Sequence, residues 1–156
     1  HDDWEFARTH DIVAILSVDP NFRESIRQTQ PAKLVVDFLN TRDYDLMEEV
    51  IGEIDIAFIS GDADVVTRLE RLAASVDTLI VVTLGNQGSI AFHQWARYKQ
   101  CAVPVAHVVD VTGCGDAYQA AFTIAWFQGH GVRAAMASGA DAASHILAHY
   151  GAVAHA

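Results

Sequence analysis

The chain has 156 residues, of which 51% are hydrophobic, and it carries a formal net charge of −10. This length allows one globular domain with a sizeable core. The negative charge argues against a nucleic-acid or anionic-membrane partner, because binding to phosphate backbones requires clustered Lys and Arg. It leaves a small phosphate ligand open, since backbone N–H groups alone can hold one.

The number of cysteines and the length of the apolar runs bear on the cellular location of the protein. Two cysteines, Cys101 and Cys114, are too few for a disulfide framework and favour a reducing compartment, so we expect a cytoplasmic protein. No apolar run approaches the roughly 20 residues that cross a bilayer, and we expect no signal peptide. Because the sequence starts at His1, a few residues before a strand-like segment, we expect further polypeptide upstream.

Over the first half of the chain, short apolar runs alternate with amphipathic stretches. The apolar runs predict buried strands at residues 12–18 (IVAILSV), 34–39 (LVVDFL), 56–60 (IAFIS) and 79–84 (LIVVTL). The stretches between them predict helices at residues 20–30, 44–54 and 63–76. Pro20 suits the start of the first helix, and Asp62 is expected to cap the third. Apolar strands that alternate with helices predict a parallel sheet with helices on both faces.

The pattern changes in the second half. Shorter strands are expected at residues 89–92 and within 96–109, as antiparallel additions at the sheet edge. Two helices, at residues 115–128 and 132–149, close the chain. The second is rich in Ala and Gly, which suits close packing on the sheet or the close approach of a flat ligand. We favour the packing interpretation.

Residues 113–116 (GCGD) form a compact turn between a predicted strand at 105–109 and a predicted helix. Glycines permit positive φ and let a phosphate approach the main chain. The first N–H groups of a helix are unpaired and lie at the positive end of its dipole, so they form an anion site. A carboxylate there repels phosphate unless it has a task. Asp116 either accepts the proton of an attacking hydroxyl or caps the helix, and this segment alone leaves both open.

Residues 110–118 (DVTGCGDAY) resemble the signature Asp-Thr-x-Gly-Ala-Gly-Asp-x-Phe of the ribokinase-like (PfkB) carbohydrate kinases. The matching positions are Asp110, Gly113, Gly115 and Asp116. The differing positions are Val111 for Thr, Cys114 for Ala and Tyr118 for Phe. The signature is fairly specific, and other segments accompany it.

A second segment resembles the Thr-x-Gly-x-x-Gly nucleotide loop of the same family. It comprises Thr83, Gly85 and Gly88, at the expected distance upstream of the signature. The Ala-rich closing helix, followed by residues 150–152 (YGA), resembles the family's last core helix, so the resemblance covers nearly the whole chain. Within the family, the runs VVTLGNQGSIAF and HYGA look most like fructoselysine 6-kinases.

The resemblance implies a ribokinase-like, three-layer α/β/α fold with a mostly parallel central sheet. Family members are about twice as long as this chain, and their N-terminal half carries the β-lid and most sugar contacts. Residues 1–156 would then be the C-terminal, nucleotide-binding portion of a single kinase domain that lacks that half and the lid. Because lids mediate dimerisation in many members, we also consider a homodimer.

The resemblance also implies roles for individual residues. Asp116 is similar to the catalytic base that deprotonates a primary hydroxyl of the sugar. The amides of Gly113, Cys114 and Gly115 resemble the anion hole around the γ-phosphate of ATP. The remaining implied contacts are Thr83, Gly85 and Gly88 along the nucleotide, Ala140 and Ser144 facing adenine, and Asp110 and Thr112 beside a monovalent cation such as K⁺. Mg²⁺ would be bound by the ATP phosphates.

The chain departs from the family pattern at two places. The family's Asn-x-x-Glu motif is absent from residues 60–64 (SGDAD), where Asp62 or Asp64 substitutes through water or, as we favour, starts a helix as a solvated acid. Residues 19–23 (DPNFR) look like the family's Asp-Pro-Asn-x-Arg motif. By order of elements, residues 34–42 (LVVDFLNTR) fit that place better, so we interpret Asp19 as a turn or N-cap residue.

The implied function is an ATP-dependent sugar kinase that transfers the γ-phosphate to a primary hydroxyl. A fructoselysine-like sugar–amine is the favoured substrate, and a sugar of the ribose or fructose type is the alternative within the family. From another class, a noncatalytic nucleotide-binding or interaction fragment remains open. An oxidoreductase is disfavoured, because no Gly-x-Gly-x-x-Gly follows a strand.

Overall fold

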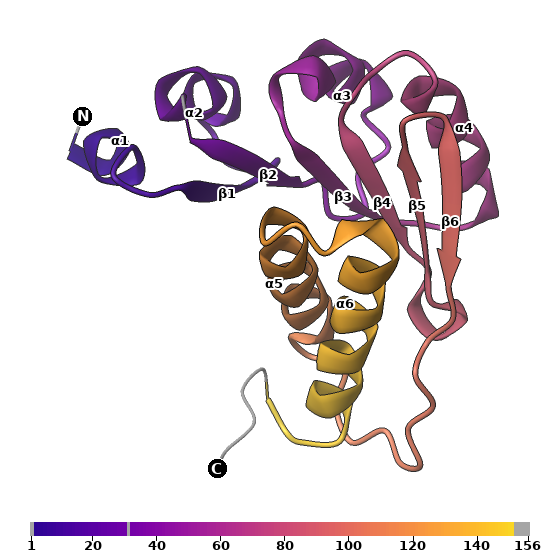
Figure 1. Cartoon of the computed structure of the whole chain (residues 1–156). Coiled ribbons are helices and arrows are strands. Elements are labelled where there is room, and N and C mark those ends of the chain that lie inside the picture. Colours follow the sequence, from indigo (N-terminus) through magenta and orange to yellow (C-terminus); the bar gives the residue numbers. More distant parts are fainter. Residues whose placement is uncertain (1, 31, 152–156) are drawn as a thin grey trace. The chain divides into compact units, whose positions relative to one another are not determined.

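The computed structural model describes residues 2–30 and 32–151, so His1, Pro31 and the end of the HYGA run lie outside the described residues. Its strands are β1 (Ile12–Leu16), β2 (Lys33–Asp37), β3 (Ile56–Ser60), β4 (Leu79–Thr83), β5 (Ser89–His93) and β6 (Ala96–Gln100) (Figure 1). Its α-helices are α1 (Asp2–Ala7), α2 (Phe22–Thr29), α3 (Tyr44–Val50), α4 (Ala63–Ala73), α5 (Cys114–Phe127) and α6 (Gly131–Leu147). Two short 3₁₀ helices are η1 (Ile51–Glu53) and η2 (Gly85–Gln87).

The strands form one six-stranded sheet in the order β1-β2-β3-β4-β5-β6. The pairs β1–β2 and β2–β3 are parallel, with Ile12 opposite Lys33 and Val35 opposite Ile56. β5 and β6 are joined by a two-residue turn in which Gln94 and Trp95 both have positive φ, 49° and 68°. Two positive φ values characterise the type I′ turns of antiparallel hairpins. The sheet is therefore mixed, as the alternation of apolar runs and the later short strands predicted.

The chain divides into two compact units, one comprising residues 1–82 and 92–96 and the other residues 83–91 and 97–156. In the first unit, the middle of each of β2, β3 and β4 is buried at every successive residue. Burial of consecutive residues means that both faces of these strands are covered, which explains their continuous apolar sequence. α4 adds Val65, Val66 and Leu69 to this core from one side of the helix.

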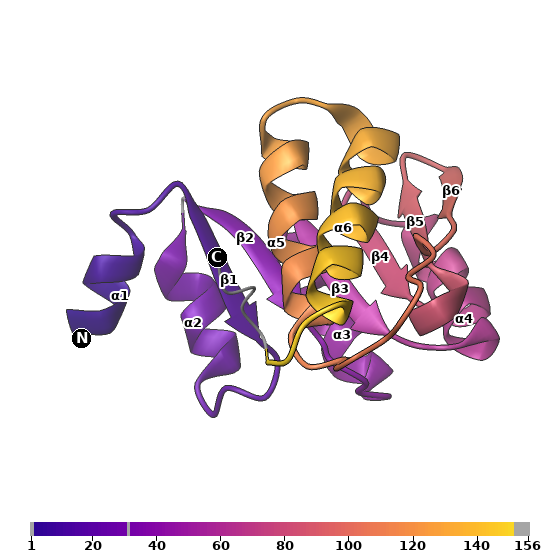
Figure 2. The same cartoon turned by 90° about the horizontal axis from the view of Figure 1, so that it is seen from below.

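The second unit is built around α5 and α6, which lie side by side in both views (Figures 1 and 2). Its buried side chains include Tyr118, Phe122, Ala135 and Met136. α5 is followed by Gly129, whose positive φ of 85° ends the helix, close to the end that the sequence predicted at residue 128. This helix pair carries the GCGD turn at the N-terminus of α5.

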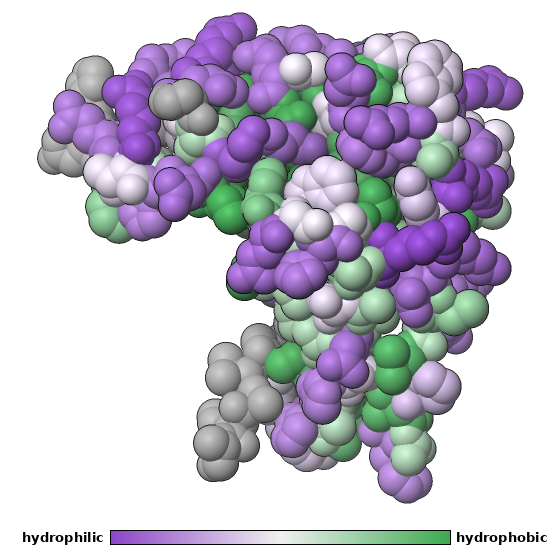
Figure 3. Space-filling model, in the orientation of Figure 1, coloured by the Kyte–Doolittle hydropathy of each residue, from purple (hydrophilic) through white to green (hydrophobic). Residues whose placement is uncertain are grey.

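Hydrophilic residues cover much of the visible surface, with smaller hydrophobic areas between them (Figure 3). This distribution agrees with a net charge of −10 in a chain that is half hydrophobic. Within the described residues, no helix is both long enough and apolar enough to cross a membrane.

Polar side chains near the helix N-termini make the local hydrogen bonds that the sequence predicts. Asp62 caps α4 as predicted, because its Oδ1 accepts hydrogen bonds from the N–H of Asp64 at 3.0 Å and of Val65 at 3.1 Å. Asp19 is a turn residue, as interpreted, and its Oδ1 accepts from the N–H of Asn21 at 2.8 Å. The helix predicted for residues 44–54 ends at Val50 and continues as η1.

One expectation about the elements is wrong, and one helix was missed. The strand predicted at residues 105–109 is not formed, because residues 101–110 contain no strand. Val109 instead donates its N–H to the carbonyl of Leu147, at the end of α6, and Pro104 lacks the donor that a ladder needs. The helix α1, before β1, was not predicted.

Candidate functional site

The turn before α5 depends on one glycine. Gly113 has φ 79° and ψ −2°, the left-handed region that glycine adopts without strain. It occupies the N-cap position, and its carbonyl accepts the N–H of Ala117 at 2.9 Å. The N–H of Cys114 donates to the carbonyl of Val111 at 3.3 Å, which closes the turn. The chain therefore enters α5 directly from a tight loop, without the preceding strand that was expected.

Unpaired donors remain at this helix end. The N–H groups of Gly113, Gly115 and Asp116 make no hydrogen bond to another described residue. They lie at the positive end of a helix of 14 residues, where backbone donors and the dipole favour an anion. Of the three amides predicted to form an anion hole, that of Cys114 is occupied within the turn, whereas those of Gly113 and Gly115 are not.

Asp116 lies in the first turn of α5 and is exposed. The alternative that it caps the helix is not seen, because the N-cap residue is Gly113 and no side chain caps this end. Its carboxylate makes no hydrogen bond or ion pair with another described side chain. The Asp116 carboxylate is therefore exposed in the same helix turn as the unpaired backbone donors.

Asp110 holds the entry to α5 against the end of α6. Its Oδ1 accepts from the N–H and the hydroxyl of Thr112, at 2.9 and 2.8 Å, and its Oδ2 accepts from the N–H of Gly151 at 3.0 Å. These hydrogen bonds, that of the Thr112 N–H first, hold the pKa of Asp110 below its usual range. Carboxylate and hydroxyl oxygens suit a hard cation, but here they also bind each other.

The nucleotide-like loop connects β4 to β5. Thr83 is the last residue of β4, and Gly85 begins η2 with φ 58° and open space around its Cα. Gly88 has φ 93°, and a Cβ there would lie 2.0 Å from the carbonyl oxygen of Gln100 and 2.7 Å from the nitrogen of Ala102. Glycine at position 88 is thus required by the close approach of the chain after β6. Gly85 is the more accessible of the two.

The small residues of α6 differ in their burial and in their contacts. Ala140 is buried, whereas Ser144 is half-buried and donates its hydroxyl to the carbonyl of Asp141 at 2.7 Å. A Cβ on Gly139 would lie 2.9 Å from two ring carbons of Tyr118 and 3.0 Å from its carbonyl oxygen. The favoured interpretation was packing on the sheet. The structure shows that Gly139 packs against α5.

Sequence reasoning missed a buried polar contact in this unit. The hydroxyls of Ser89 and Tyr118 lie 2.8 Å apart, and both side chains are buried. Burial raises the pKa of Tyr118 to about 12, so the phenol stays protonated. The available signal was a Tyr inside an apolar helix and a Ser at the start of an apolar strand, since buried hydroxyls require partners. The contact joins the first residue of β5 to α5.

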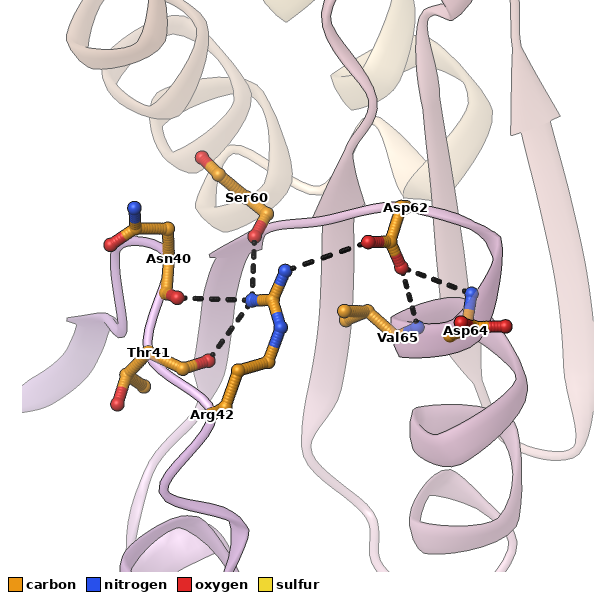
Figure 4. A network of polar contacts seen from close by, with 7 residues as sticks. All are labelled: Asn40, Thr41, Arg42, Ser60, Asp62, Asp64 and Val65. Carbon is orange, nitrogen blue, oxygen red and sulfur yellow. Dashed lines mark hydrogen bonds and ion pairs between the residues drawn. The ribbon is translucent and has the colours of Figure 1, made fainter.

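In the first unit, polar groups gather where β2 and β3 end (Figure 4). Nη1 of Arg42 donates to the carbonyls of Asn40, Thr41 and Ser60, at 3.0, 3.2 and 3.4 Å. Its Nη2 lies 3.7 Å from Oδ2 of Asp62. Arg42 therefore joins the ends of the two strands, and Asp62 serves as both cap and ion-pair partner, while Asp64 is exposed, as a solvated helix-start acid is expected to be.

The predicted site residues all fall in one unit. The loop from Thr83 to Gly88, the turn from Asp110 to Asp116, and Ala140 and Ser144 lie within residues 83–91 and 97–151. Contacts inside this unit connect all three segments: Ser89 to Tyr118, Gly139 to Tyr118, and Asp110 to Gly151, four residues beyond the end of α6. Among residues 2–30 and 32–151, no group of three or more His, Cys, Asp or Glu side chains could hold a metal ion.

Comparison with known proteins gives consistent results. The model of the pfkB family carbohydrate kinases matches residues 6–156. A fructoselysine 6-kinase of Shigella flexneri is 31% identical over 119 residues, which are 74% of this chain and 45% of that protein. A fructokinase of Klebsiella pneumoniae is 37% identical over 119 residues, which are 75% of this chain and 37% of that protein.

The fold also has a close counterpart among solved structures. The structure of Arabidopsis thaliana ribokinase complexed with ribose and ATP has a TM-score of 0.78 at 24% identity, and the match covers 97% of this chain and 54% of that one. The chain spans less than half the length of the two curated relatives and about half of this solved structure.

Proposed function

Because this chain belongs to the pfkB family of carbohydrate kinases, we propose that it supplies the nucleotide-binding side and the catalytic base of an ATP-dependent sugar kinase. The predicted ribokinase-like α/β fold is confirmed by the similarity to solved ribokinase-family structures. The observation that carries the proposal is the exposed Asp116 beside unpaired N–H groups at the start of α5. Residues 1–156 then form the C-terminal portion of a single kinase domain.

In the proposed reaction, Asp116 accepts the proton of a primary sugar hydroxyl as its oxygen attacks phosphorus. The new O–P bond forms while the bond between the γ-phosphorus and the bridging oxygen breaks. The N–H groups of Gly113 and Gly115, with the dipole of α5, stabilise the negative charge on the transferred phosphoryl group. The amide of Cys114 would join them only by releasing the carbonyl of Val111.

The other site residues bind or frame the nucleotide in this proposal. Thr83 and Gly85 lie along it, Gly88 holds their loop against the chain after β6, and Ala140 and Ser144 face the adenine. ATP, bound with Mg²⁺, supplies the phosphoryl group. Asp110 and Thr112 would add oxygen ligands for a monovalent cation such as K⁺.

For the substrate we propose a sugar–amine of the fructoselysine type. It is supported by the match to a fructoselysine 6-kinase over three quarters of this chain. A sugar of the ribose or fructose type is the alternative, since a fructokinase and a ribokinase match as well. We further propose a cytoplasmic protein that acts on small molecules and forms a homodimer.

The alternative function is nucleotide binding without catalysis. The chain spans less than half the length of the curated kinases that it matches. A protein limited to this portion would bind ATP through the second unit and transfer no phosphate. Phosphate transfer by the full-length product of the gene that encodes this chain distinguishes the two functions.

The base assignment is tested with Asp116→Asn in that full-length protein, using ATP and a panel that contains fructoselysine, ribose and fructose. Asn keeps the shape of the side chain and cannot accept the proton. We expect kcat to fall by about 10²–10⁴-fold, while calorimetric titration shows that ATP binding is retained.

Asp45→Asn is the matched control, because Asp45 is also an exposed acid in the first turn of a helix, α3. It should leave kcat unchanged. Wild-type turnover by Asp116→Asn would show that another group is the base. If the wild-type protein phosphorylates no sugar but binds ATP, the noncatalytic function is the correct one.

A further inference from the structure

One buried hydrogen bond in the second unit is not explained by packing alone. Tyr118 and Ser89 are 6% and 1% exposed, and their hydroxyls lie 2.8 Å apart. The family signature has Phe at the position of Tyr118, and Phe would fill the same space with its ring. A buried hydroxyl is costly unless it is hydrogen-bonded. The Tyr therefore adds one specific link, from α5 to the first residue of β5.

The ring of Tyr118 also lies against Phe122 and Gly139. It stacks on Phe122 of α5 with the ring centroids 6.0 Å apart. On α6, Gly139 lies so close that an added Cβ would be 2.9 Å from two ring carbons. Because the side chains of Tyr118 and Phe122 are both buried, the Tyr118 ring has little room to move. Tyr118 thus connects α5, α6 and the start of β5 through one side chain.

Each end of these contacts adjoins a residue of the proposed site. Tyr118 follows Asp116 by two residues, Ser89 directly follows Gly88, and Gly139 directly precedes Ala140. We propose that Tyr118 is a positioning residue that, through its hydrogen bond to Ser89, fixes the nucleotide loop relative to Asp116 and α6. This inference rests on the proposed function. It assigns to Tyr118 a role that touches neither ATP nor sugar.

Removing the hydrogen bond between Tyr118 and Ser89 should reduce the affinity for ATP more than it reduces the stability of the fold. The experiment compares Tyr118→Phe, Ser89→Ala and the double variant in the full-length protein. The dissociation constant for ATP is measured by calorimetry, and KM for ATP, KM for sugar and kcat are measured by kinetics. Each single variant should weaken ATP binding and raise KM for ATP by up to about fivefold, which is the change expected if the full net free energy of one hydrogen bond is lost from the ATP-bound state. KM for sugar should not change.

The double variant tests whether the two hydroxyls act as one unit. It should be no weaker in ATP binding than the single variants, because the bond is already lost in each of them. Additive losses would show that the residues act separately and would overturn the proposal.

Thr78→Val is the matched control, because it also removes a buried hydroxyl, which donates to the carbonyls of Ile51 and Ile54 in the first unit. It should lower Tm without changing the affinity for ATP. If Tyr118→Phe and Ser89→Ala behave like this control, Tyr118 serves packing alone and the proposal is wrong.

The calorimetric measurement separates this inference from the proposed function. A protein that binds ATP but phosphorylates no sugar refutes the kinase assignment, while the ATP affinities of the variants still decide the role of Tyr118. A wild-type protein that binds no ATP refutes both.

Discussion

Asp37, Asp62, Asp110 and Asp116 all lie near a strand end or a helix start, but their carboxylates differ in the hydrogen bonds that they accept. Asp37 and Asp62 each accept hydrogen bonds from backbone N–H groups close in sequence. Asp110 accepts two from backbone N–H groups, those of Thr112 and Gly151, and one from the hydroxyl of Thr112. Asp116 accepts none from another described residue. A carboxylate whose oxygens already accept hydrogen bonds is a poorer proton acceptor, and this difference supports our proposal that Asp116, rather than Asp37, Asp62 or Asp110, is the base.

At the cap of α4, we predict that Asp62→Ala lowers Tm by about 2–4 °C, because the N–H groups of Asp64 and Val65 lose their acceptor. Asp62→Asn keeps a capping oxygen and should lower Tm by less. The remaining difference reports the ion pair with Arg42, whose atoms lie 3.7 Å apart. Thermal denaturation followed by circular dichroism measures all three proteins, and equal Tm values for wild type and Asp62→Ala would contradict the cap.

The same residue predicts a pH dependence. The N–H of Val65, then that of Asp64 and the charge of Arg42, hold the pKa of Asp62 below its ordinary value. A depressed folded pKa gives stability that is fully present above the unfolded pKa, about 3.9, and is lost as the pH falls through the folded pKa. The Tm difference between wild type and Asp62→Ala should therefore stay constant from pH 7 to about pH 5 and shrink below about pH 4. A difference that persists unchanged at the lowest pH would contradict this origin.

At the scale of elements, the pairing of α5 with α6 explains much of the small-residue composition of α6. The backbone of α6 approaches the ring and carbonyl of Tyr118 at Gly139, and Ala135 and Met136 are buried nearby in the same helix. Small side chains let two helices pack at short distance. The Ala-rich sequence therefore does not by itself indicate a ligand surface, and the proposed adenine contact is limited to Ala140 and Ser144.

For this helix pair we predict that Gly139→Ala destabilises the protein. The added Cβ would lie 2.9 Å from the Tyr118 ring and 3.0 Å from a backbone oxygen. Such overpacking costs about 1–3 kcal/mol, and the better helix propensity of Ala offsets about 1 kcal/mol of it. The free energy of unfolding in urea should fall by up to about 2 kcal/mol. Gly52→Ala, with nothing within 4 Å of the added Cβ, is the control and should be near neutral; a stabilised Gly139→Ala would show that α6 moves without cost.

At the scale of the whole molecule, the proposed chemistry is confined to one of two units. Residues 83–91 and 97–151 contain every residue that we assign to ATP, to the phosphoryl group and to the proton. The first unit contributes the parallel strands and the cluster around Arg42, which holds the ends of β2 and β3. Because the proposed nucleotide contacts lie in the second unit alone, bound ATP should slow backbone amide exchange there and not in the first unit.

We predict that ATP slows amide hydrogen exchange in peptides from residues 83–91 and 110–119, because ligand binding suppresses local opening of the segments it contacts. Peptides from α2 and α3 should exchange at unchanged rates. Mass spectrometry of the full-length protein, with and without ATP, measures both sets. Protection restricted to the first unit would contradict the assignment of the loop and the turn.

Several elements of the fold could be predicted from the pattern of apolar and capping residues close together in the sequence. The strands at β3 and β4 and the cap at Asp62 were predicted because apolar runs and capping residues act on their immediate neighbours. Residues 105–109 were also apolar, yet they form no strand. A short apolar run does not show whether another strand lies beside it, and here Val109 pairs with the end of α6 instead.

The sequence by itself determined the α/β alternation, the family resemblance and the identity of Asp116 as a candidate base, because these depend on residues close together along the chain. Only the tertiary structure decided that Gly88 and Gly139 serve close packing, that Asp110 is bound by Gly151, and that Tyr118 meets Ser89. The physical reason is separation: Tyr118 and Ser89 lie 29 residues apart, and Asp110 and Gly151 lie 41 apart. Contacts of this kind exist only once the chain has folded back on itself.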